Sequence, residues 1–370
     1  YIEWFAAEAL RMEGEIIPSL SSDKRILVLR EPVGVCAAIT SWNFPEAMIT
    51  RKVAPALAAG CSILVKPAPQ TPFSALALAE LALRAGLPPG LFSVLTGEAT
   101  VIGPVFTGSP VIRKLSFTGS TAVGKKLIAE SASTVKRVTM ELGGNAPFIV
   151  FEDADLESAV EGLIASKFRV SGQTCISANR ILIHQSVSEH FTKLLLPAVG
   201  KLKVGPGTKQ AVDQGPLINE AAVVKVERVI ADAMAHGAKL LAGGKRHALG
   251  GTFFEPTILS NCTAAMEVAR VEIFGPVIPI FTFVTDEEAI ALANATEFGL
   301  ASYFYSRDLD RVWRVAEALQ YGMVGVNAGI ISNAAAPFGG VKDSGYGREG
   351  SRHGIEDYLA IKYVCMGGLR

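Results

Sequence analysis

The chain has 370 residues, 49% of them hydrophobic, and its 35 Lys and Arg residues balance its 35 Asp and Glu residues. With domains of about 150 residues as the usual size, this length predicts two or three globular domains with buried cores. The zero net charge excludes a global field that would attract nucleic acid or an anionic membrane. The five cysteines follow no metal-ligand spacing, so we expect reduced thiols and no metal site.

The beginning of the chain gives little information on targeting. The sequence contains neither an apolar run of about 18 residues nor a basic-then-apolar leader, so we expect a soluble, cytoplasmic protein. However, the first residue is Tyr1 rather than Met, and residues 1–10 resemble the middle of an amphipathic helix. We therefore expect N-terminal residues to be missing, which leaves mitochondrial targeting open.

Residues 33–150 alternate between short strand-like runs and longer helical runs. This alternation is typical of a parallel sheet covered by helices, and it predicts a doubly wound nucleotide-binding domain. The expected strands are residues 33–39, 62–65, 91–95, 114–117, 137–141 and 147–151. The expected helices are residues 47–59, 72–85, 99–106 and 122–131.

A second α/β series follows from about residue 152 to 345. Its expected helices are residues 156–169, 187–202, 221–236, 287–295 and 310–321, and its expected strands include 277–282 and 322–327. Residues 337–347 are too glycine-rich for regular structure. Residues 25–30 and 358–365 alternate like strands and could form an edge for pairing between subunits.

These patterns give a fold class of two doubly wound α/β domains with a small β element for oligomerisation. The expected divisions are residues 1–32 for a partial helix and oligomerisation strands, 33–144 for cofactor binding, 145–350 for catalysis, and 351–370 for a last oligomerisation strand.

A cysteine in a glycine-containing turn is the first candidate for chemistry. Cys175 ends the segment GQTC at residues 172–175, and Glu141 begins the segment ELGG at residues 141–144. A thiolate attacks carbonyls, and a tight turn offers backbone amides that favour its charge, while a carboxylate can assist it. On cysteine statistics alone, a small buried apolar group is the commoner role.

Three further features lie at the ends of expected strands. Asn43 could donate its amide N–H to an oxyanion, although such an Asn more often caps a helix. Lys66 could hydrogen-bond a ribose, although an isolated lysine in a proline-rich turn is usually solvated. Gly119 and Ser120 open a helix whose free amides could face a phosphate.

Two alternative chemistries are less favoured. Residues 119–125 fit the first part of a P-loop, but Lys126 stands where Ser or Thr would hold magnesium. A Cys–His pair would use His184 as its nearest candidate, but His184 ends an apolar strand-like run and is interpreted as structural.

Seven segments together resemble the aldehyde dehydrogenase superfamily, in the family's order and over essentially the whole chain. They are WNFP at residues 42–45, KP at 66–67, FTGS at 117–120, ELGG at 141–144, GQTC at 172–175, EIFGP at 272–276 and PFGG at 337–340. Within this superfamily the chain is most similar to the succinate-semialdehyde dehydrogenases, judged from residues 66–82, 215–220 and 337–350. About a hundred N-terminal residues of the usual enzyme would then be absent.

The resemblance implies a role for each matching residue. Cys175 would be the nucleophile, Asn43 and the Cys175 N–H the oxyanion donors, and Glu141 the base that activates water. Glu272 would bind the nicotinamide ribose with Phe274 against the ring. The other implied cofactor residues are Trp42, Lys66, Pro67, Ala68, Pro69, Gly119, Ser120 and Leu142. The implied ligands of the distal substrate carboxylate are Arg51, Arg169 and Ser332, and arginine suits this role because its planar fork binds carboxylate in a bidentate way.

The implied reaction is the NAD(P)-dependent oxidation of succinate semialdehyde to succinate by a homodimer or homotetramer. Glutarate semialdehyde, one methylene longer, is the rival substrate, and a truncated, non-catalytic assembly subunit is the rival from another class. Many NAD-preferring relatives carry Glu at the position of Pro69, where it would repel a 2′-phosphate, so we expect NADP to be preferred and NAD to be possible. Ser177 stands where some relatives carry a second cysteine, so we expect no redox-switch disulfide.

Overall fold

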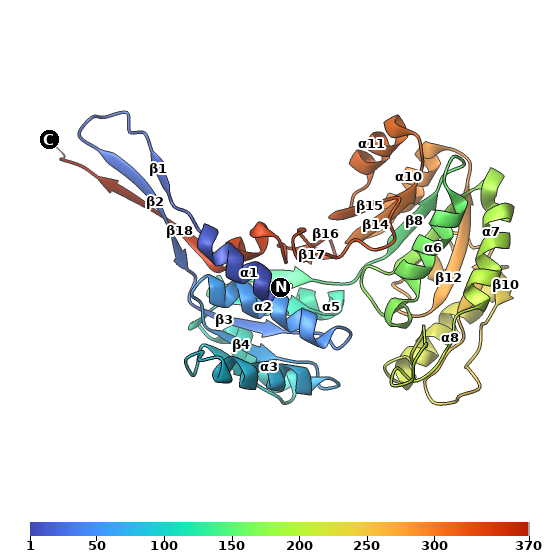
Figure 1. The fold of residues 1–370 in the computed structure, drawn as a ribbon, viewed down its shortest axis with the longest axis horizontal. Helices are drawn as coiled ribbons and strands as arrows, with labels where there is room; N and C mark the ends of the chain where they lie inside the picture. The colour runs from blue at the N-terminus through green and yellow to red at the C-terminus, as the bar shows by residue number, and fades with distance from the viewer. Residues whose placement is uncertain (369–370) are drawn as a thin grey trace. The chain divides into compact units, whose positions relative to one another are not determined.

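The computed structural model describes residues 1–368, which form two compact units (Figure 1). The first unit comprises Tyr1–Leu142, Ser332–Gly339 and Gly345–Arg370, and the second comprises Gly143–Ile331 and Gly340–Ser344. Among the described residues, no helix has the length and apolar character needed to cross a membrane.

The first unit is built on a six-stranded sheet with the order β17-β7-β6-β3-β4-β5. Its parallel strands are β3 (Val35–Ile39), β4 (Ile63–Lys66), β5 (Phe92–Val94), β6 (Ile112–Thr118) and β7 (Arg137–Glu141), and β17 (Gly345–Tyr346) pairs antiparallel with β7. The chain proceeds from β3 to β4 and β5 on one side, and then returns to β6 and β7 on the other. The switch point therefore lies between β3 and β6, where open α/β sheets bind ligands at the carboxyl ends of the strands.

The helices of this sheet are α2 (Pro45–Ala58), α3 (Pro72–Arg84), α4 (Ala99–Gly108) and α5 (Thr121–Ser131). Each begins within two residues of its predicted start. Thr71 precedes α3 as expected, but its side chain makes no capping hydrogen bond. Pro72, which needs no N–H partner in the first helical turn, starts the helix instead.

A separate three-stranded antiparallel sheet also belongs to the first unit. It has the order β1-β2-β18, with β1 (Glu15–Ile17), β2 (Arg25–Pro32) and β18 (Leu359–Met366). The two terminal segments predicted as strands thus pair with each other along eight residues, from Leu359 opposite Pro32 to Met366 opposite Arg25. Near it lie α1 (Ile2–Glu8) and the short 3-10 helices η1 (Ala9–Arg11) and η4 (Arg352–Tyr358).

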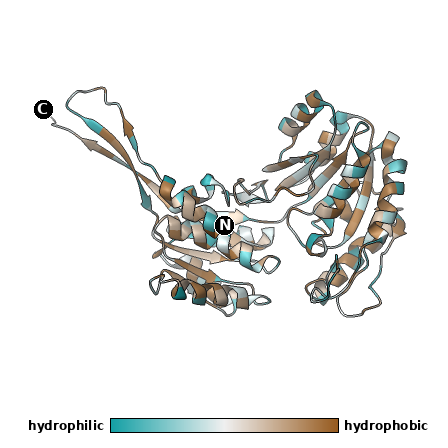
Figure 2. Cartoon of the chain, in the orientation of Figure 1, coloured by the Kyte–Doolittle hydropathy of each residue, from teal (hydrophilic) through white to brown (hydrophobic). Residues whose placement is uncertain are grey.

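The second unit contains a seven-stranded sheet with the order β10-β11-β12-β9-β8-β14-β15. Its strands are β8 (Ala146–Val150), β9 (Ala178–His184), β10 (Lys239–Ala242), β11 (Thr257–Ser260), β12 (Val277–Phe283), β14 (Ala301–Tyr305) and β15 (Met323–Val326). Only β10 is antiparallel to its neighbour. Both large sheets are mainly hydrophobic along their strands, as buried parallel strands must be (Figure 2).

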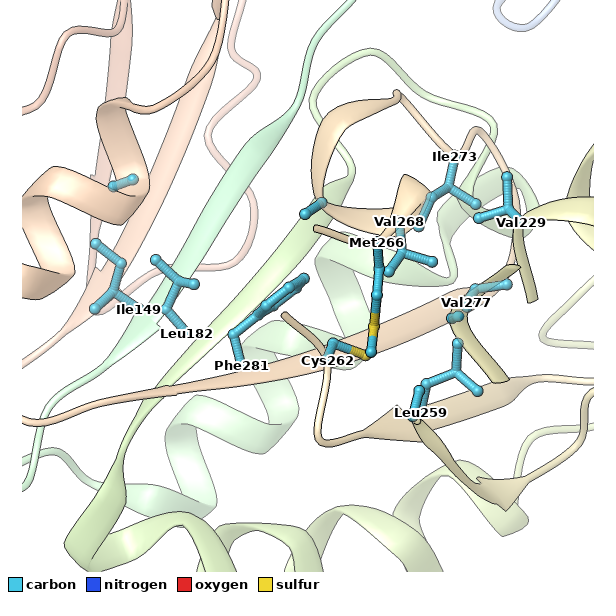
Figure 3. Packing of buried hydrophobic residues seen from close by; sticks show 14 of the residues in the cluster. Ile149, Leu182, Val229, Leu259, Cys262, Met266, Val268, Ile273, Val277 and Phe281 are labelled. Carbon is cyan, nitrogen blue, oxygen red and sulfur yellow. The ribbon is translucent and has the colours of Figure 1, made fainter. Parts of the chain in front are cut away.

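Helices cover both faces of this sheet, and alternate strand residues show it. On β8, Phe148 and Val150 pack with α6 (Leu156–Lys167) and α7 (Gln185–Gly200). Ile149 belongs to the opposite core with Leu182 of β9 (Figure 3). That core also contains residues of α8 (Glu220–Ala235), α9 (Glu267–Arg270), α10 (Asp286–Asn294) and α11 (Leu309–Ala318). The doubly wound prediction is therefore confirmed for this unit.

The second sheet also has a switch point in its strand order, and the side-chain carboxylate of Asp153 lies there. The chain continues from β8 to β9 on one side and from β14 to β15 on the other. At the carboxyl ends of β8 and β14, Asp153 accepts hydrogen bonds from Ser306 Oγ (2.9 Å), Arg307 N (2.7 Å) and Asp308 N (2.8 Å). Arg311 Nη1 donates to its other oxygen at 2.7 Å. Donors at a helix start are a usual anion site, and here Asp153 occupies it.

Several segments differ from the predictions. The strands β1, β10, β11 and β14 were not predicted, because short strands are recognised mainly by their pairing partners. Residues 337–347 hold two-residue strands, β16 (Val341–Lys342) and β17, although their glycine content predicted none. The structure also assigns residues 345–350 and 332–339 to the first unit rather than to the expected catalytic domain, since β17 pairs with β7 and Phe338 with Glu349.

We expect the substitution Asp153→Asn to lower the free energy of unfolding by about 1–3 kcal/mol at neutral pH, because four hydrogen-bond donors lose their charged acceptor. Burial opposes ionisation of Asp153, but the bonds from Ser306, Arg307 and Asp308 outweigh it and lower its pKa. The stabilisation is then complete above the unfolded pKa and is lost as the pH falls through the lower folded pKa. Urea unfolding of the parent and the variant from pH 7 to 3 measures the difference in free energy of unfolding. The exposed Asp310→Asn is the control. An equal loss of stability in both variants would contradict the role of Asp153.

Candidate active site

The nucleophile candidate follows a turn with unusual backbone geometry. Cys175 is half-buried and lies between the 3-10 helix η3 (Arg169–Gly172) and β9. Val170, Ser171 and Gly172 have φ values of 50°, 59° and 76°, all in the left-handed region. Such a conformation is strained for a β-branched residue such as Val170, and it is typical of functional segments. The tight turn predicted around Cys175 is confirmed.

Two glycines allow other segments to approach this turn closely. A Cβ atom on Gly172 would lie 2.3 Å from Gly275 O, and one on Gly144 would lie 2.2 Å from Cys175 O. Real Cβ contacts are never this short, so any side chain would displace backbone at either position. The last glycine of the ELGG segment therefore lies directly against the backbone of the cysteine.

The residues of the turn are also held by the segment GPLINE at 215–220. Ser171 Oγ donates to Gly215 O at 2.8 Å, and Gln173 Oε1 accepts from Ile218 N at 2.8 Å. From the sequence, GPLINE indicated only similarity to a subfamily, and its contacts with the turn were not predicted. His184, the alternative partner for a thiol, instead caps α7 by accepting from Ser186 N and contacts Val284 O through its other nitrogen.

The general-base candidate, Glu141, ends β7 and has an exposed fraction of only 2%. Neither of its carboxylate oxygens has a hydrogen-bond partner. Burial raises its pKa well above the usual value, and the nearby Glu349 raises it further, while Lys52, Arg51 and Arg348 oppose the shift. A carboxyl group in this state stays protonated to a higher pH than an exposed one, and its ionised form is a stronger base.

A buried ion-pair network surrounds Glu141 in the first unit. The carboxylate of Glu349 contacts the amine of Lys52, and it accepts from Arg51 Nη1 at 3.4 Å. Arg51 also donates to the Tyr1 hydroxyl at 2.9 Å, and its guanidinium stacks on the ring of Phe338 at 4.6 Å. Lys52 and Glu349 were missed by the sequence reasoning, since charges distant in the chain show no local signal.

Several of the predicted cofactor and oxyanion residues of the first unit lie at the carboxyl ends of its strands. Asn43 follows β3 and accepts from Ser41 Oγ at 2.8 Å. Helix α2 begins after Phe44 as its N-cap, so the alternative that Asn43 caps the helix does not hold. Lys66 ends β4 with its amine 3.2 Å from Pro67 O, and burial lowers its pKa while Glu98 opposes this. Pro67 and Ala68 are buried, whereas Pro69 is exposed.

The start of α5 is the place where the sequence predicts a phosphate group. Ser120 is the N-cap of this helix, and its side chain makes no capping hydrogen bond. Gly119 N donates to Glu141 O at 3.1 Å, and a Cβ on Gly124 would lie 2.4 Å from the side chain of Leu142. These contacts connect the helix start to the ELGG segment. The half-buried Trp42 completes the set at the switch point of this sheet.

In the second unit, Glu272 lies beside the nucleophile segment. Its Oε1 accepts from Gly144 N at 2.9 Å, and Lys225 Nζ donates to its backbone carbonyl at 2.6 Å. Burial raises the pKa of Glu272 to about 7, while the Gly144 N–H, Lys225 and Lys167 oppose the shift. Lys167 is fully buried with no hydrogen-bond partner for its amine, and burial lowers its pKa to about 7. Phe274 has a left-handed φ of 55°.

The predicted substrate ligands lie in different surroundings. Arg169 is exposed and belongs to η3, whereas Arg51 is buried in the network around Glu349. Ser332 is half-buried and begins a segment of the first unit. In the described part of the chain, no cluster of His, Cys, Asp and Glu could hold a metal ion.

The second unit thus joins Cys175 to the Glu272 carboxylate through Gly144, and the first unit has an open α/β sheet with polar residues at its carboxyl edge. The aldehyde dehydrogenase family model matches residues 1–364. The chain belongs to the aldehyde dehydrogenase family, whose members are NAD(P)-dependent oxidoreductases.

The chain is also similar to three bacterial dehydrogenases whose names state a substrate. The chain is 63% identical to a 3-sulfolactaldehyde dehydrogenase of Pseudomonas putida and 60% identical to a glutarate-semialdehyde dehydrogenase of Pseudomonas aeruginosa, each time over the full chain and 76% of the relative. It is 59% identical to the NADP-dependent succinate-semialdehyde dehydrogenase of Escherichia coli, over 99% of this chain and 76% of the relative.

A solved structure confirms the fold. The structure of a succinate-semialdehyde dehydrogenase from Burkholderia pseudomallei matches with a TM-score of 0.98 and 63% identity, over 99% of this chain and 76% of that chain. The predicted family and fold class are therefore confirmed.

We expect the substitution Glu141→Gln to stabilise the protein at neutral pH. Because the folded pKa of Glu141 lies above its unfolded value, its stabilising contribution is complete below the unfolded pKa and is lost as the pH rises toward the folded one. The advantage of the Gln variant then grows with pH, by up to about 1.4 kcal/mol per unit. Thermal unfolding of both proteins from pH 4 to 8 measures the difference.

The matched control is Glu349→Gln, a second buried carboxylate of the same network. This variant should lose about 3–5 kcal/mol, since it removes the carboxylate that Lys52 and Arg51 contact. A Glu141→Gln variant that is less stable than the parent at every pH would show that the buried carboxyl group is not a cost to folding.

Proposed function

We propose that this protein oxidises a short aldehyde with a distal anionic group, with succinate semialdehyde as the substrate and succinate as the product. One observation supports the chemistry above all: Cys175 lies in a strained turn with Gly144 against its carbonyl and Glu272 bonded to the Gly144 N–H. Such an arrangement fits a thiol that reacts beside a bound nucleotide.

The reaction begins with attack of the Cys175 sulfur on the aldehyde carbon, which forms a C–S bond and an oxyanion. The Cys175 N–H and the Asn43 amide stabilise this negative charge. A nicotinamide cofactor, when bound, would accept the hydride that the thiohemiacetal on Cys175 must lose to become a thioester. The Glu272 carboxylate would hold the ribose of that cofactor.

Glu141 acts in the second half of the reaction. Its ionised carboxylate removes a proton from water, whose oxygen attacks the thioester carbon and breaks the C–S bond. The product acid leaves, and Cys175 is free again. The raised pKa of Glu141 makes it a strong enough base for this step, and the adjacent Lys52–Glu349 pair offers an acceptor for the proton.

The distal anion is the common element of the candidate substrates. The names of the relatives refer to aldehydes that carry a carboxylate or a sulfonate, and both groups suit a guanidinium. We assign this contact to the exposed Arg169, six residues before Cys175, with Arg51 and Ser332 as further ligands. Glutarate semialdehyde remains the second candidate, because one methylene changes binding by only about 1–3 kcal/mol.

The proposed cofactor is NADP, with NAD as a weaker alternative. Pro69 is exposed next to the buried Lys66, so no carboxylate stands at this position to repel a 2′-phosphate. For assembly we propose a homodimer or homotetramer through the sheet β1-β2-β18. That sheet exposes Ile16, Ile361 and Tyr363, with exposed fractions of 77%, 70% and 63%.

The decisive experiment measures initial rates with succinate semialdehyde, glutarate semialdehyde and 3-sulfolactaldehyde, each with NADP and NAD. We expect the highest kcat/KM for succinate semialdehyde with NADP, none for Cys175→Ala, and an acyl-enzyme that accumulates in Glu141→Gln. Absence of oxidation of all three aldehydes by a folded protein would favour a non-catalytic assembly role. A higher kcat/KM for another aldehyde would replace succinate semialdehyde as the proposed substrate, and a higher kcat/KM with NAD would replace NADP as the proposed cofactor.

We expect Arg169→Ala to raise KM for succinate semialdehyde by about 10- to 100-fold, since a charge-assisted bond contributes about 1.5–3 kcal/mol. The KM for butanal, which has no carboxylate, should remain within about twofold of the parent, because Arg169 would not contact it. Steady-state kinetics on both aldehydes measure the ratio. An equal rise in both KM values would assign Arg169 to the structure of the turn instead.

A further inference from the structure

A buried carboxamide clamps the segment that presents Glu272. Asn179 has an exposed fraction of 3%, and its Oδ1 accepts from Ile273 N at 3.0 Å. Its Nδ2 donates to Val271 O at 2.8 Å. These two backbone groups flank Glu272 on either side, so one side chain binds the segment as a neighbouring β-strand would.

The side chain of Asn179 is in turn held by the side chain of Asn145. Its second N–H donates to Asn145 Oδ1 at 2.6 Å, and Asn145 Nδ2 donates to Ala269 O at 3.1 Å. Arg180 Nη2 in turn donates to Asn145 O at 3.1 Å and to Ala293 O at 2.8 Å. Both side-chain N–H groups of Asn179 are therefore used, and a buried amide with all its bonds made has one defined orientation.

The same elements connect this clamp to the nucleophile. Asn179 follows Cys175 by four residues on the same segment, at the start of β9. Asn145 is adjacent to Gly144, whose N–H binds Glu272 Oε1 and whose Cα faces Cys175 O. The backbone on both sides of Glu272 is thus bound by a residue of the Cys175 segment, and its carboxylate is bound by the glycine that packs against Cys175 O.

We propose that Asn179 is a positioning residue that fixes Glu272 relative to Cys175, and thereby fixes the nicotinamide ribose for hydride transfer. The proposal rests on the function proposed above, in which Glu272 binds that ribose. Asn179 itself touches neither substrate nor cofactor. A displacement of about 1 Å in such a positioning group costs up to about 100-fold in rate, although no reacting group is removed.

The test uses Asn179→Ala and Asn179→Ser, with kcat expressed per molecule of folded protein, as determined by gel filtration and circular dichroism. We expect kcat with NADP to fall about 10- to 100-fold. The kinetic isotope effect with a 1-deuterated aldehyde should rise, because hydride transfer becomes rate-limiting. Unchanged kcat per folded molecule and an unchanged isotope effect in both variants would overturn the proposal.

A double-mutant cycle with Glu272→Gln tests whether Asn179 acts through Glu272. We expect kcat of the double variant to lie within about twofold of kcat of Glu272→Gln alone. Once the Glu272 carboxylate has been removed, the loss of the Asn179 side chain that positions it should have no further effect. Effects that multiply would overturn the assignment. The affinity of the same four proteins for the reduced nucleotide, measured by the fluorescence of the nucleotide, provides a second double-mutant cycle that needs no catalytic turnover. If no aldehyde is oxidised but this cycle is non-additive, the clamp stands and the proposed function fails.

Asn294 provides a matched control within the same unit. Its Nδ2 donates to Ala318 O at 2.9 Å, and its Oδ1 accepts from Gln320 N at 2.9 Å, so it clamps the backbone around Leu319 in the same way. Asn294→Ala should lower the melting temperature, as Asn179→Ala does, but should leave the isotope effect unchanged. An isotope effect that rises equally in both variants would show that loss of any clamp suffices, and would overturn the specific role of Asn179.

Discussion

The close approach of three backbone segments at Cys175 is the constraint on which the proposed chemistry depends. Gly144, Gly172 and Gly275 meet there at distances that leave no space for a Cβ atom on the first two. Three successive left-handed residues bring the chain into this turn, including the strained Val170. Polar contacts from the GPLINE segment hold Ser171 and Gln173 in this turn, as surrounding structure must where a strained backbone persists.

Each large sheet carries its proposed site residues at one end of its own strands, the carboxyl end in the first unit and the amino end in the second. In the first unit, Asn43, Lys66 and Glu141 lie at the carboxyl ends of parallel strands, as in other open α/β sheets. In the second unit, the segments before β8, β9 and β12 carry Gly144, Cys175 and Glu272 at the amino ends. The carboxyl edge of that sheet is closed by Asp153, which satisfies the donors that an anionic ligand would otherwise bind.

Buried charge is the second theme of the proposed site. Glu141 has no hydrogen-bond partner for its carboxylate, and Lys167 has none for its amine. Such groups lower stability unless they are neutral, and their shifted pKa values are the physical consequence. Stability is therefore given up at positions where the charged form is unfavourable in the folded protein, which is a usual compromise in an enzyme site.

The sequence by itself determined the elements with strong periodicity, the doubly wound class and the local motifs around Asn43, Lys66, Glu141, Cys175 and Glu272, because each depends on neighbours within a few residues. It also indicated the tight turn at Cys175 through Gly172. Only the tertiary structure decided that Asn179 clamps Glu272, that Glu349 joins Lys52 and Arg51, and that residues 345–350 join the first unit. Those contacts join residues up to about three hundred positions apart, and such pairing follows from the packing of whole sheets, for which one sequence carries no local signal.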